Sequence, residues 1–184
     1  SSAAQNLSAN PTDPSARRIY IESAQSVAIK FNSIAGSLDK LQEQLVGNWQ
    51  QPATIEGSDI YMSIQDFNKG LERLAELNKQ IDIQGEGASS GLISERANLL
   101  KDLSSYMDLN VEYNKNGSVD VKVGDVKLVS GAEQQLKLNV TAGDATTPAI
   151  VTVEKMDGTL VLSNANSEIE GGQIGAILDI VNTS

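Results

Sequence analysis

The chain has 184 residues, of which 40% are hydrophobic and 21% are charged, which is the composition of a folded globular protein. Its 14 Lys and Arg residues against 24 Asp and Glu residues give a net charge of −10, so nucleic acid and anionic membrane surfaces are poor partners. Because the sequence has no His and no Cys, it excludes an imidazole base, a thiolate nucleophile, Cys/His zinc sites and disulfides, and with them most common catalytic schemes.

The first predicted helix begins in the segment Asn-Pro-Thr-Asp-Pro at residues 10–14. Thr12 or Asp13 can cap a helix, and Pro14 suits its first turn. Gly47 and Pro52 end the helix, and a loop follows. Between these signals, apolar residues alternate at three- and four-residue spacing, which places them in one stripe along the helix: Ala24, Val27, Phe31, Ile34, Leu38, Leu41 and Leu45.

A second helix is predicted from Ser58 to about Ile81, with a stripe of matching spacing formed by Ile60, Ile64, Phe67, Leu71, Leu74 and Ile81. Long helices joined by a short loop usually pack antiparallel, so we expect the two stripes to form a core that further helices complete. The alternative is that such a coiled-coil stripe forms a seam between molecules. A mobile Gly-rich loop at residues 85–91 and a third helix at about residues 92–106 follow.

After Asp108 the apolar period changes from helical to two. Alternation at residues 109–113 and 119–123, on either side of Asn116-Gly117, predicts a β-hairpin. Further short antiparallel strands are predicted at residues 126–129, 136–140, 150–154 and 159–162, with a second tight turn at Asp157-Gly158 between the last two.

Gly171-Gly172 precedes the apolar face of a last helix, which carries Ile174, Ile177, Leu178 and Val181. The predicted fold is therefore α+β: a long-helix bundle over residues 1–108, a small antiparallel β part over 109–170, and the start of a return helix over 171–184 that packs on the bundle.

No apolar run approaches the roughly 20 residues needed to cross a bilayer, and residues 1–10 lack the basic and apolar regions of a secretory signal. Ser1 is not an initiator residue, so we expect a processed chain or a piece of a longer protein. Cysteine usage gives no information on the redox compartment.

Few residues suggest a chemical site. The Gly85–Gly91 segment lacks the G-x-G-x-x-G spacing of a nucleotide loop and follows a helix rather than a strand. Gly171-Gly172 can present amides to an anion, but we expect a flexible helix entry. The nearest carboxylate pairs, Glu168 with Glu170 and Asp120 with Asp125, lie in strands and loops where solvated acids are normal. No calcium-loop pattern is present. We therefore predict no catalytic, cofactor-binding or metal-binding residue, and no small-molecule substrate.

Aromatic residues give one candidate contact. Trp49 lies in the loop between the first two helices, where it either packs locally or anchors a neighbouring subunit. The β part has no aromatic residue after Tyr113, which disfavours sugar binding there.

Several segments resemble bacterial flagellar hook-associated protein 1 as a family. Residues 92–108 are similar to a family helix with Leu pairs around an Arg and an aliphatic-Asp exit. Here Arg96 takes the Arg position, Ser94 and Ala97 stand where the family has acids, and Glu95 is expected to substitute in part. Residues 10–17 resemble the family's Asn-Pro-Ser-Asp-Pro-Ala-Ala-Arg entry to a long helix. Residues 77–81, 116–119 and 171–179 continue the resemblance in the same order.

The resemblance implies a structural protein of the flagellum at the hook-filament junction, with no enzyme activity, located outside the cell after type III export. Implied partners are further copies in the full-length protein, the hook protein, the second junction protein and an export chaperone. This chain would be the central part, without the terminal helical core segments, and should stay soluble and non-polymerising alone. The alternatives are an extracellular adhesin or host-binding module, or another axial protein such as hook protein or flagellin.

Overall fold

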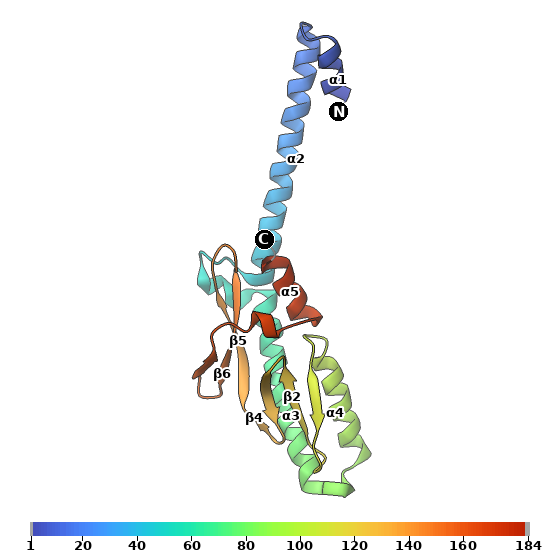
Figure 1. Cartoon of the computed structure of the whole chain (residues 1–184), viewed down its shortest axis with the longest axis vertical. Helices are drawn as coiled ribbons and strands as arrows, with labels where there is room; N and C mark the ends of the chain where they lie inside the picture. Colours follow the sequence, from blue (N-terminus) through green and yellow to red (C-terminus); the bar gives the residue numbers. More distant parts are fainter. Residues whose placement is uncertain (1, 183–184) are drawn as a thin grey trace. The chain divides into compact units, whose positions relative to one another are not determined.

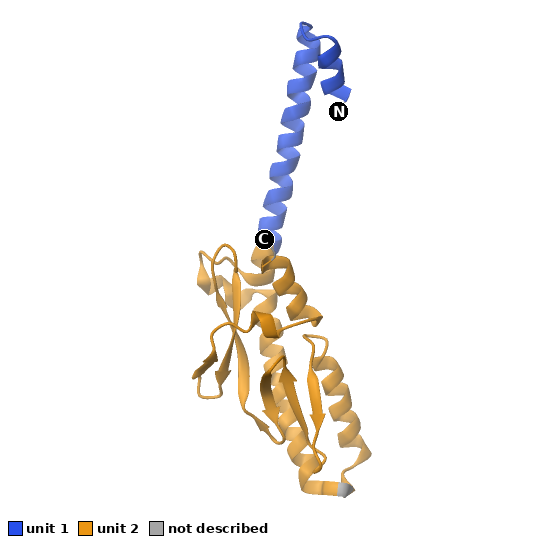
Figure 2. Ribbon diagram, in the orientation of Figure 1, with its two compact units in different colours: residues 1–41 blue, residues 42–184 orange. Residues whose placement is uncertain are grey.

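The computed structural model describes residues 2–182, apart from the side chain of Glu86. Helices are followed by antiparallel strands and a final helix, which confirms the predicted α+β class (Figure 1). The chain divides into two compact units, residues 1–41 and residues 42–184 (Figure 2). No helix in the described part of the chain is both long enough and apolar enough to span a bilayer.

Unit 1 contains helix α1 (Ser2–Ala9) and most of helix α2 (Pro14–Val46). Helix α2 begins where predicted: the Asp13 carboxylate accepts a hydrogen bond from the backbone N–H of Ser15 at 2.9 Å, and Pro14 occupies the first turn. Helix α1 has no counterpart among the predicted elements, because eight residues with Leu7 as the one large apolar side chain make no readable stripe.

Unit 2 begins with the last residues of α2. The helix ends just before Gly47, whose φ of +75° is a conformation that favours glycine. A Cβ at this position would lie 2.8 Å from the backbone of Ile55. The 3-10 turn η1 (Pro52–Gly57) leads to Ser58, which caps helix α3 (Asp59–Gln84) by accepting from the Tyr61 N–H at 3.4 Å. The second helix is confirmed and runs three residues beyond its predicted end.

Helix α3 is the central element of unit 2. Its stripe lies in the hydrophobic core, and it contacts α4, α5 and strands of both sheets (Figure 1). Helix α4 (Ser90–Leu103) packs against it where Gly70 of α3 meets Leu103; a Cβ at Gly70 would lie 2.5 Å from the Leu103 side chain. Ser89 caps α4 by accepting from the Leu92 N–H at 3.3 Å. The small residue therefore sets the close approach of the two helices.

The strands form two antiparallel sheets. The first has the order β1-β2-β3-β4 and comprises β1 (Asn110–Tyr113), β2 (Val119–Val123), β3 (Val126–Ser130) and β4 (Glu133–Gln134). The second has the order β5-β6-β7 and comprises β5 (Leu136–Ala142), β6 (Ala149–Lys155) and β7 (Leu160–Leu162). Both predicted hairpins are confirmed, with Gly117 and Gly158 at φ +84° and +86° in their turns. Strand β4, two residues long, is too short to predict.

Asparagine side chains join the helices and loops to the strands in unit 2. The Asn78 amide donates to the carbonyls of Val119 (2.8 Å) and Gly131 (2.7 Å), and its oxygen accepts from the Val119 N–H at 3.2 Å. Asn166 bonds the carbonyl of Ala149 and the N–H of Val151 in the same manner. We call such a side chain, which takes up backbone groups of a strand, an asparagine clamp. Asn68 is the third: it donates to the Leu138 carbonyl at 2.7 Å and accepts from the Leu138 N–H at 3.0 Å.

Helix α5 (Gly172–Asn182) contacts α3. The predicted boundaries after residues 108 and 170 coincide with changes of secondary structure, whereas the two compact units divide after Leu41. The division of the chain into three parts stays a prediction.

Candidate assembly surface

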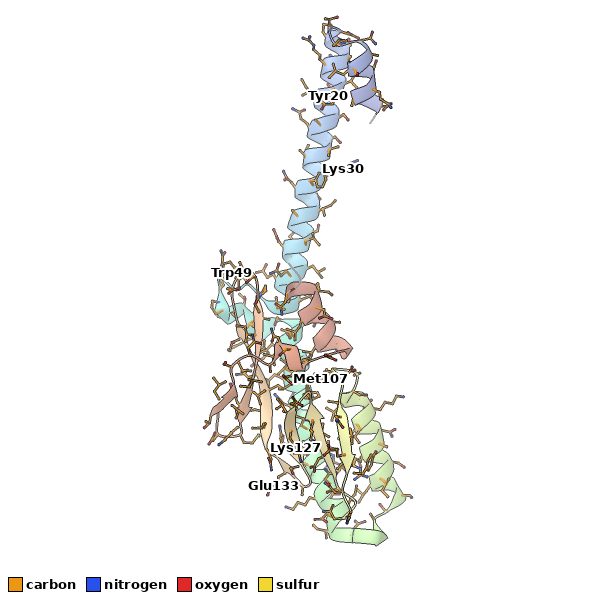
Figure 3. All side chains as sticks on the ribbon, in the orientation of Figure 1. Tyr20, Lys30, Trp49, Met107, Lys127 and Glu133 are labelled. Atoms are coloured by element: carbon orange, nitrogen blue, oxygen red, sulfur yellow. The ribbon has the colours of Figure 1, made fainter. Side chains whose placement is uncertain are left out.

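An apolar stripe runs along the part of α2 that belongs to unit 1. We call it the α2 stripe; its members are Tyr20, Ala24, Val27, Phe31, Ile34, Leu38 and Leu41. All seven are exposed, and the six large side chains are 41–68% exposed (Figure 3, which labels Tyr20). The prediction that the stripe of the first helix lies in a core is therefore wrong for these residues. Contiguous exposed apolar side chains mark a surface for association.

The positions that flank the α2 stripe are mostly small and uncharged. In heptad terms, one flank carries Ile21, Ala28 and Ala35, and the other carries Ser23, Lys30 and Ser37. Lys30 is the one charged side chain among these six, and it is labelled in Figure 3. Charged flanks set partner choice and register in coiled coils. The α2 stripe is therefore an apolar surface whose flanks carry little charge.

Trp49 lies between α2 and η1, in a turn closed by a bridge between Asn48 and Gln51. Its side chain is half-buried, and the neighbouring Asn48 N–H donates to Thr54 Oγ1 at 2.7 Å. The local turn is thus well bonded. The role of Trp49 as an anchor for a neighbouring subunit stays a prediction.

Arg96 is the centre of the helix that carries the sequence resemblance, and it is buried. Its Nη1 donates to the carbonyl of Gly117 at 2.5 Å and lies 3.5 Å from Asn78 Oδ1. The guanidinium also lies 5.7 Å from the ring centroid of Tyr113. Arg96 therefore fastens the turn between β1 and β2 to helix α4.

The predicted role of Glu95 as a substitute partner for Arg96 is wrong. Glu95 Oε1 pairs with Arg73 Nη2 at 2.6 Å, which joins α4 to α3 at the surface. Sequence adjacency favoured Arg96, but consecutive residues of a helix point to different faces.

The two glycine-rich segments are both structured. Gly85–Gly87 forms the 3-10 turn η2, so a wholly irregular loop at residues 85–91 is not observed. At the entry to α5, Gly171 and Gly172 have φ of +61° and +57°. The next two amides, of Gln173 and Ile174, donate to the carbonyls of Ser105 and Tyr106 at 2.9 and 2.8 Å. These amides are used inside the fold and are not presented to an anion.

The expectation that the four acids of the candidate pairs are solvated surface groups is wrong for Asp120. Asp120 is buried, and its Oδ2 pairs with Lys127 Nζ at 2.6 Å while Oδ1 accepts from Asn114 and from the Gly131 N–H, each at 2.8 Å. Lys127 above all lowers the pKa of Asp120 to about 2. Asp120 is therefore a structural anion of the first sheet.

The other three acids, Asp125, Glu168 and Glu170, line one open hollow of about 250 Å³ together with Asp108. Glu168 Oε2 accepts from the backbone N–H of Asp125 at 3.0 Å, and the carbonyl of Glu170 accepts from the Asp108 N–H at 2.7 Å. Within residues 2–182, no group of three or more acidic side chains is placed to hold a metal ion.

The asparagine clamps were the contacts that the sequence analysis missed. One signal for them exists: Asn78 falls on the three-four spacing of the α3 stripe, between Leu74 and Ile81. A polar residue within a buried stripe needs hydrogen-bond partners, so its position indicates a contact with backbone or side chains.

Comparisons with known proteins agree with this architecture. The family model of the flagellar hook-associated protein FlgK helical domain matches residues 1–184. Flagellar hook-associated protein 1 of Bacillus subtilis (strain 168) is 35% identical over 115 residues, which cover 61% of this chain and 20% of that protein. The structure of the flagellar hook junction protein FlgK from Burkholderia pseudomallei is similar in fold, with a TM-score of 0.70 and 20% identity over 97% of this chain. The chain spans about a fifth of the first protein and 31% of the second.

Proposed function

Because this chain belongs to the flagellar hook-associated protein FlgK helical domain family, we propose that it is a structural, non-catalytic part of the bacterial flagellum, in an adapter at the hook-filament junction. Family membership agrees with the resemblance seen in the sequence. The full-length protein would form this junction together with further copies of itself.

The α2 stripe is the observation that carries the proposal. An adapter must bury surface against neighbouring molecules or segments, and six large apolar side chains along one helix supply it. Burying a Leu, Ile or Phe side chain contributes roughly 1.5–3 kcal/mol, which offsets part of the cost of association.

The proposal extends to location and partners. We infer an extracellular position after type III export, with an export chaperone, the hook protein and the second junction protein as contacts of the full-length protein. The absence of Cys supports export in an unfolded state, because no disulfide has to be broken or reformed.

Immunogold electron microscopy of source cells, with an antibody raised against this chain, tests the location. A compact band between hook and filament is the expected result. Label along whole filaments would point to flagellin, label along the hook to hook protein, and label over the cell body to an adhesin; each of these would overturn the proposal.

Substitutions in the full-length protein test the role of the α2 stripe. The double variant Phe31→Asp/Leu38→Asp should produce cells whose hooks carry no filament, because assembly would have to bury two unpaired charges in the α2 stripe. Ser26→Asp adds a charge on the same helix away from the stripe and should leave filaments in place. Filaments of normal number in the double variant would contradict the assigned role of the stripe.

A further inference from the structure

The turn between β1 and β2 contains the one Asn-Gly dipeptide of the sequence, Asn116-Gly117. Both residues are exposed, and Gly117 has a φ of +84°. An asparagine that precedes glycine is chemically labile, because no side chain on the glycine hinders its backbone nitrogen from attacking the asparagine side-chain amide. The sequence and the exposure of this turn therefore make Asn116 a candidate site of covalent change.

Ser118 prepares the Asn116 side chain for such an attack. Asn116 Oδ1 accepts hydrogen bonds from the backbone N–H of Ser118 at 3.2 Å and from its Oγ at 2.8 Å. Ser118 is buried, so the two donors are held in place. When a nucleophile adds to the amide carbon, negative charge develops on Oδ1, and donors already placed at that oxygen stabilise it. Both hydrogen bonds thus lower the barrier to attack at Asn116 Cγ.

The backbone of the turn opposes the attack. The Gly117 N–H donates to the Asn114 carbonyl at 3.0 Å, and the Asn114 N–H donates to the Ser118 carbonyl at 2.9 Å. The Gly117 carbonyl in turn accepts from Arg96 Nη1 at 2.5 Å. The Gly117 nitrogen must leave its hydrogen bond before it can bond to Cγ, so the reaction requires local opening of the turn, which costs less than unfolding of the protein. Arg96 therefore limits how often the reactive conformation is reached.

We propose that Asn116 is a site of spontaneous deamidation, at a rate that Arg96 limits by holding the turn closed. The Gly117 nitrogen forms a bond to Asn116 Cγ, the bond between Cγ and Nδ2 breaks, and Nδ2 leaves as ammonia with the proton of the Gly117 amide. Water then adds to either carbonyl carbon of the resulting cyclic imide and opens the ring. The products are an aspartate and an isoaspartate, whose main chain runs through the former side-chain carbon atoms.

The isoaspartate would release the contact that joins the turn to α4. It lengthens the main chain by one carbon atom directly before Gly117, which displaces the Gly117 carbonyl from Arg96. Arg96 is buried, and its next hydrogen-bond partner, Asn78 Oδ1, lies at 3.5 Å. A buried donor that loses its partner is costly, so the modified turn should detach from α4. The aspartate product leaves the main chain unchanged and should keep the contact.

Peptide mapping of the full-length protein by mass spectrometry tests the reaction. After incubation over days at mildly alkaline pH, Asn116 should lose its amide, with much less loss at mildly acidic pH, because the attacking nitrogen must give up its proton. Asn32, which precedes Ser33 at an exposed position of α2, is the reference within the same chain and should keep its amide. Asn116→Gln should abolish the loss, because the larger ring that it requires closes slowly.

Arg96→Met tests the control by Arg96, because it keeps an unbranched side chain of similar length but removes the donors. The loss of one hydrogen bond of ordinary strength should raise the deamidation rate about fivefold. Arg73→Met is the matched control: it removes an Arg from the exposed contact between α3 and α4 and should leave the rate unchanged. If Arg96→Met does not fold, Tyr113→Leu, which removes the ring beside the guanidinium, takes its place, with a smaller increase expected.

Hydrogen exchange separates the two products. Peptides that span the turn should exchange faster in the isoaspartate form of the aged protein than in Asn116→Asp, which reproduces the other product. Amide loss at Asn116 no greater than at Asn32 would overturn the proposal. So would an unchanged rate in the folded Arg96 or Tyr113 variant, an equal rise in Arg73→Met, or equal exchange in the isoaspartate form and Asn116→Asp.

Discussion

Helices α2 and α3 carry apolar stripes of the same three-four spacing, but the two stripes differ in burial. In α3 the stripe is buried under strands and neighbouring helices, whereas the α2 stripe is exposed. The α3 stripe contains a polar residue, Asn78, that bonds strand backbone; the α2 stripe contains no hydrogen-bonding group besides the Tyr20 hydroxyl. Spacing thus defines the stripe, but the residues that fasten other elements to it decide whether it becomes core.

The chain contains two Phe residues, one in each stripe, and they give the largest contrast. Phe67→Ala should lower the free energy of unfolding by about 4 kcal/mol, because Phe67 is fully buried and its removal leaves a cavity. Phe31→Ala should change it by less than about 0.5 kcal/mol, because Phe31 is 68% exposed. Urea unfolding followed by far-UV circular dichroism measures both. Similar losses for the two variants would break the comparison.

Asn78→Leu sharpens the comparison, because it makes the α3 stripe wholly apolar. If apolar spacing alone determined stability, this substitution would stabilise the packing of α3. We expect instead a loss of roughly 3 kcal/mol, since the backbone groups of Val119 and Gly131 lose their buried partner. Asn32→Leu on the exposed surface of α2 is the control, with little change expected. An unchanged urea midpoint for Asn78→Leu would show that the clamp does not hold the sheet.

Acid should weaken unit 2 through Asp120. Its folded pKa of about 2 lies below the ordinary value of 3.8, so the stabilisation is fully present above about pH 4 and is lost as pH falls towards 2. The loss should be roughly 2 kcal/mol, measured by urea unfolding across this range. Asp120→Asn should flatten the dependence, while Asp125→Asn, an exposed acid of the same sheet, should keep it. Parallel pH profiles for both variants would refute the assignment to Asp120.

Salt should have the smallest effect, on assembly through the α2 stripe. Its flanks carry one charge in six positions, so screening removes little. Sedimentation of the full-length protein at low and moderate ionic strength should give the same degree of association. A sharp dissociation with added salt would show that charged contacts outside the stripe dominate.

The sequence was sufficient for most elements of the fold, because their signals are local. The start of α2 follows from Asp13 and Pro14, and the two hairpins follow from Gly117 and Gly158 in their turns. Family resemblance also came from the sequence. Helix α1 and strand β4 were missed, since eight and two residues are too short for a periodic signal.

The contacts between elements were beyond the sequence pattern. Arg96 reaches a carbonyl 21 residues away because the turn between β1 and β2 lies against α4, and Glu95 pairs with Arg73, 22 residues away, because α4 packs on α3. The exposure of the α2 stripe is a similar case: periodicity describes one helix and contains no information about what covers it.

The asparagine clamps of α3 also bear on how the chain folds. Asn78 closes a loop of 41 residues and Asn68 one of 70. Since loop-closure entropy grows only with the logarithm of length, the longer loop costs about 0.5 kcal/mol more. Distance along the chain therefore gives neither sheet a decisive kinetic advantage in docking on α3. The order in which the sheets dock on α3 then depends on the rate at which each hairpin forms by itself. We expect the β1–β2 hairpin, with its short Asn-Gly turn, to form and dock first.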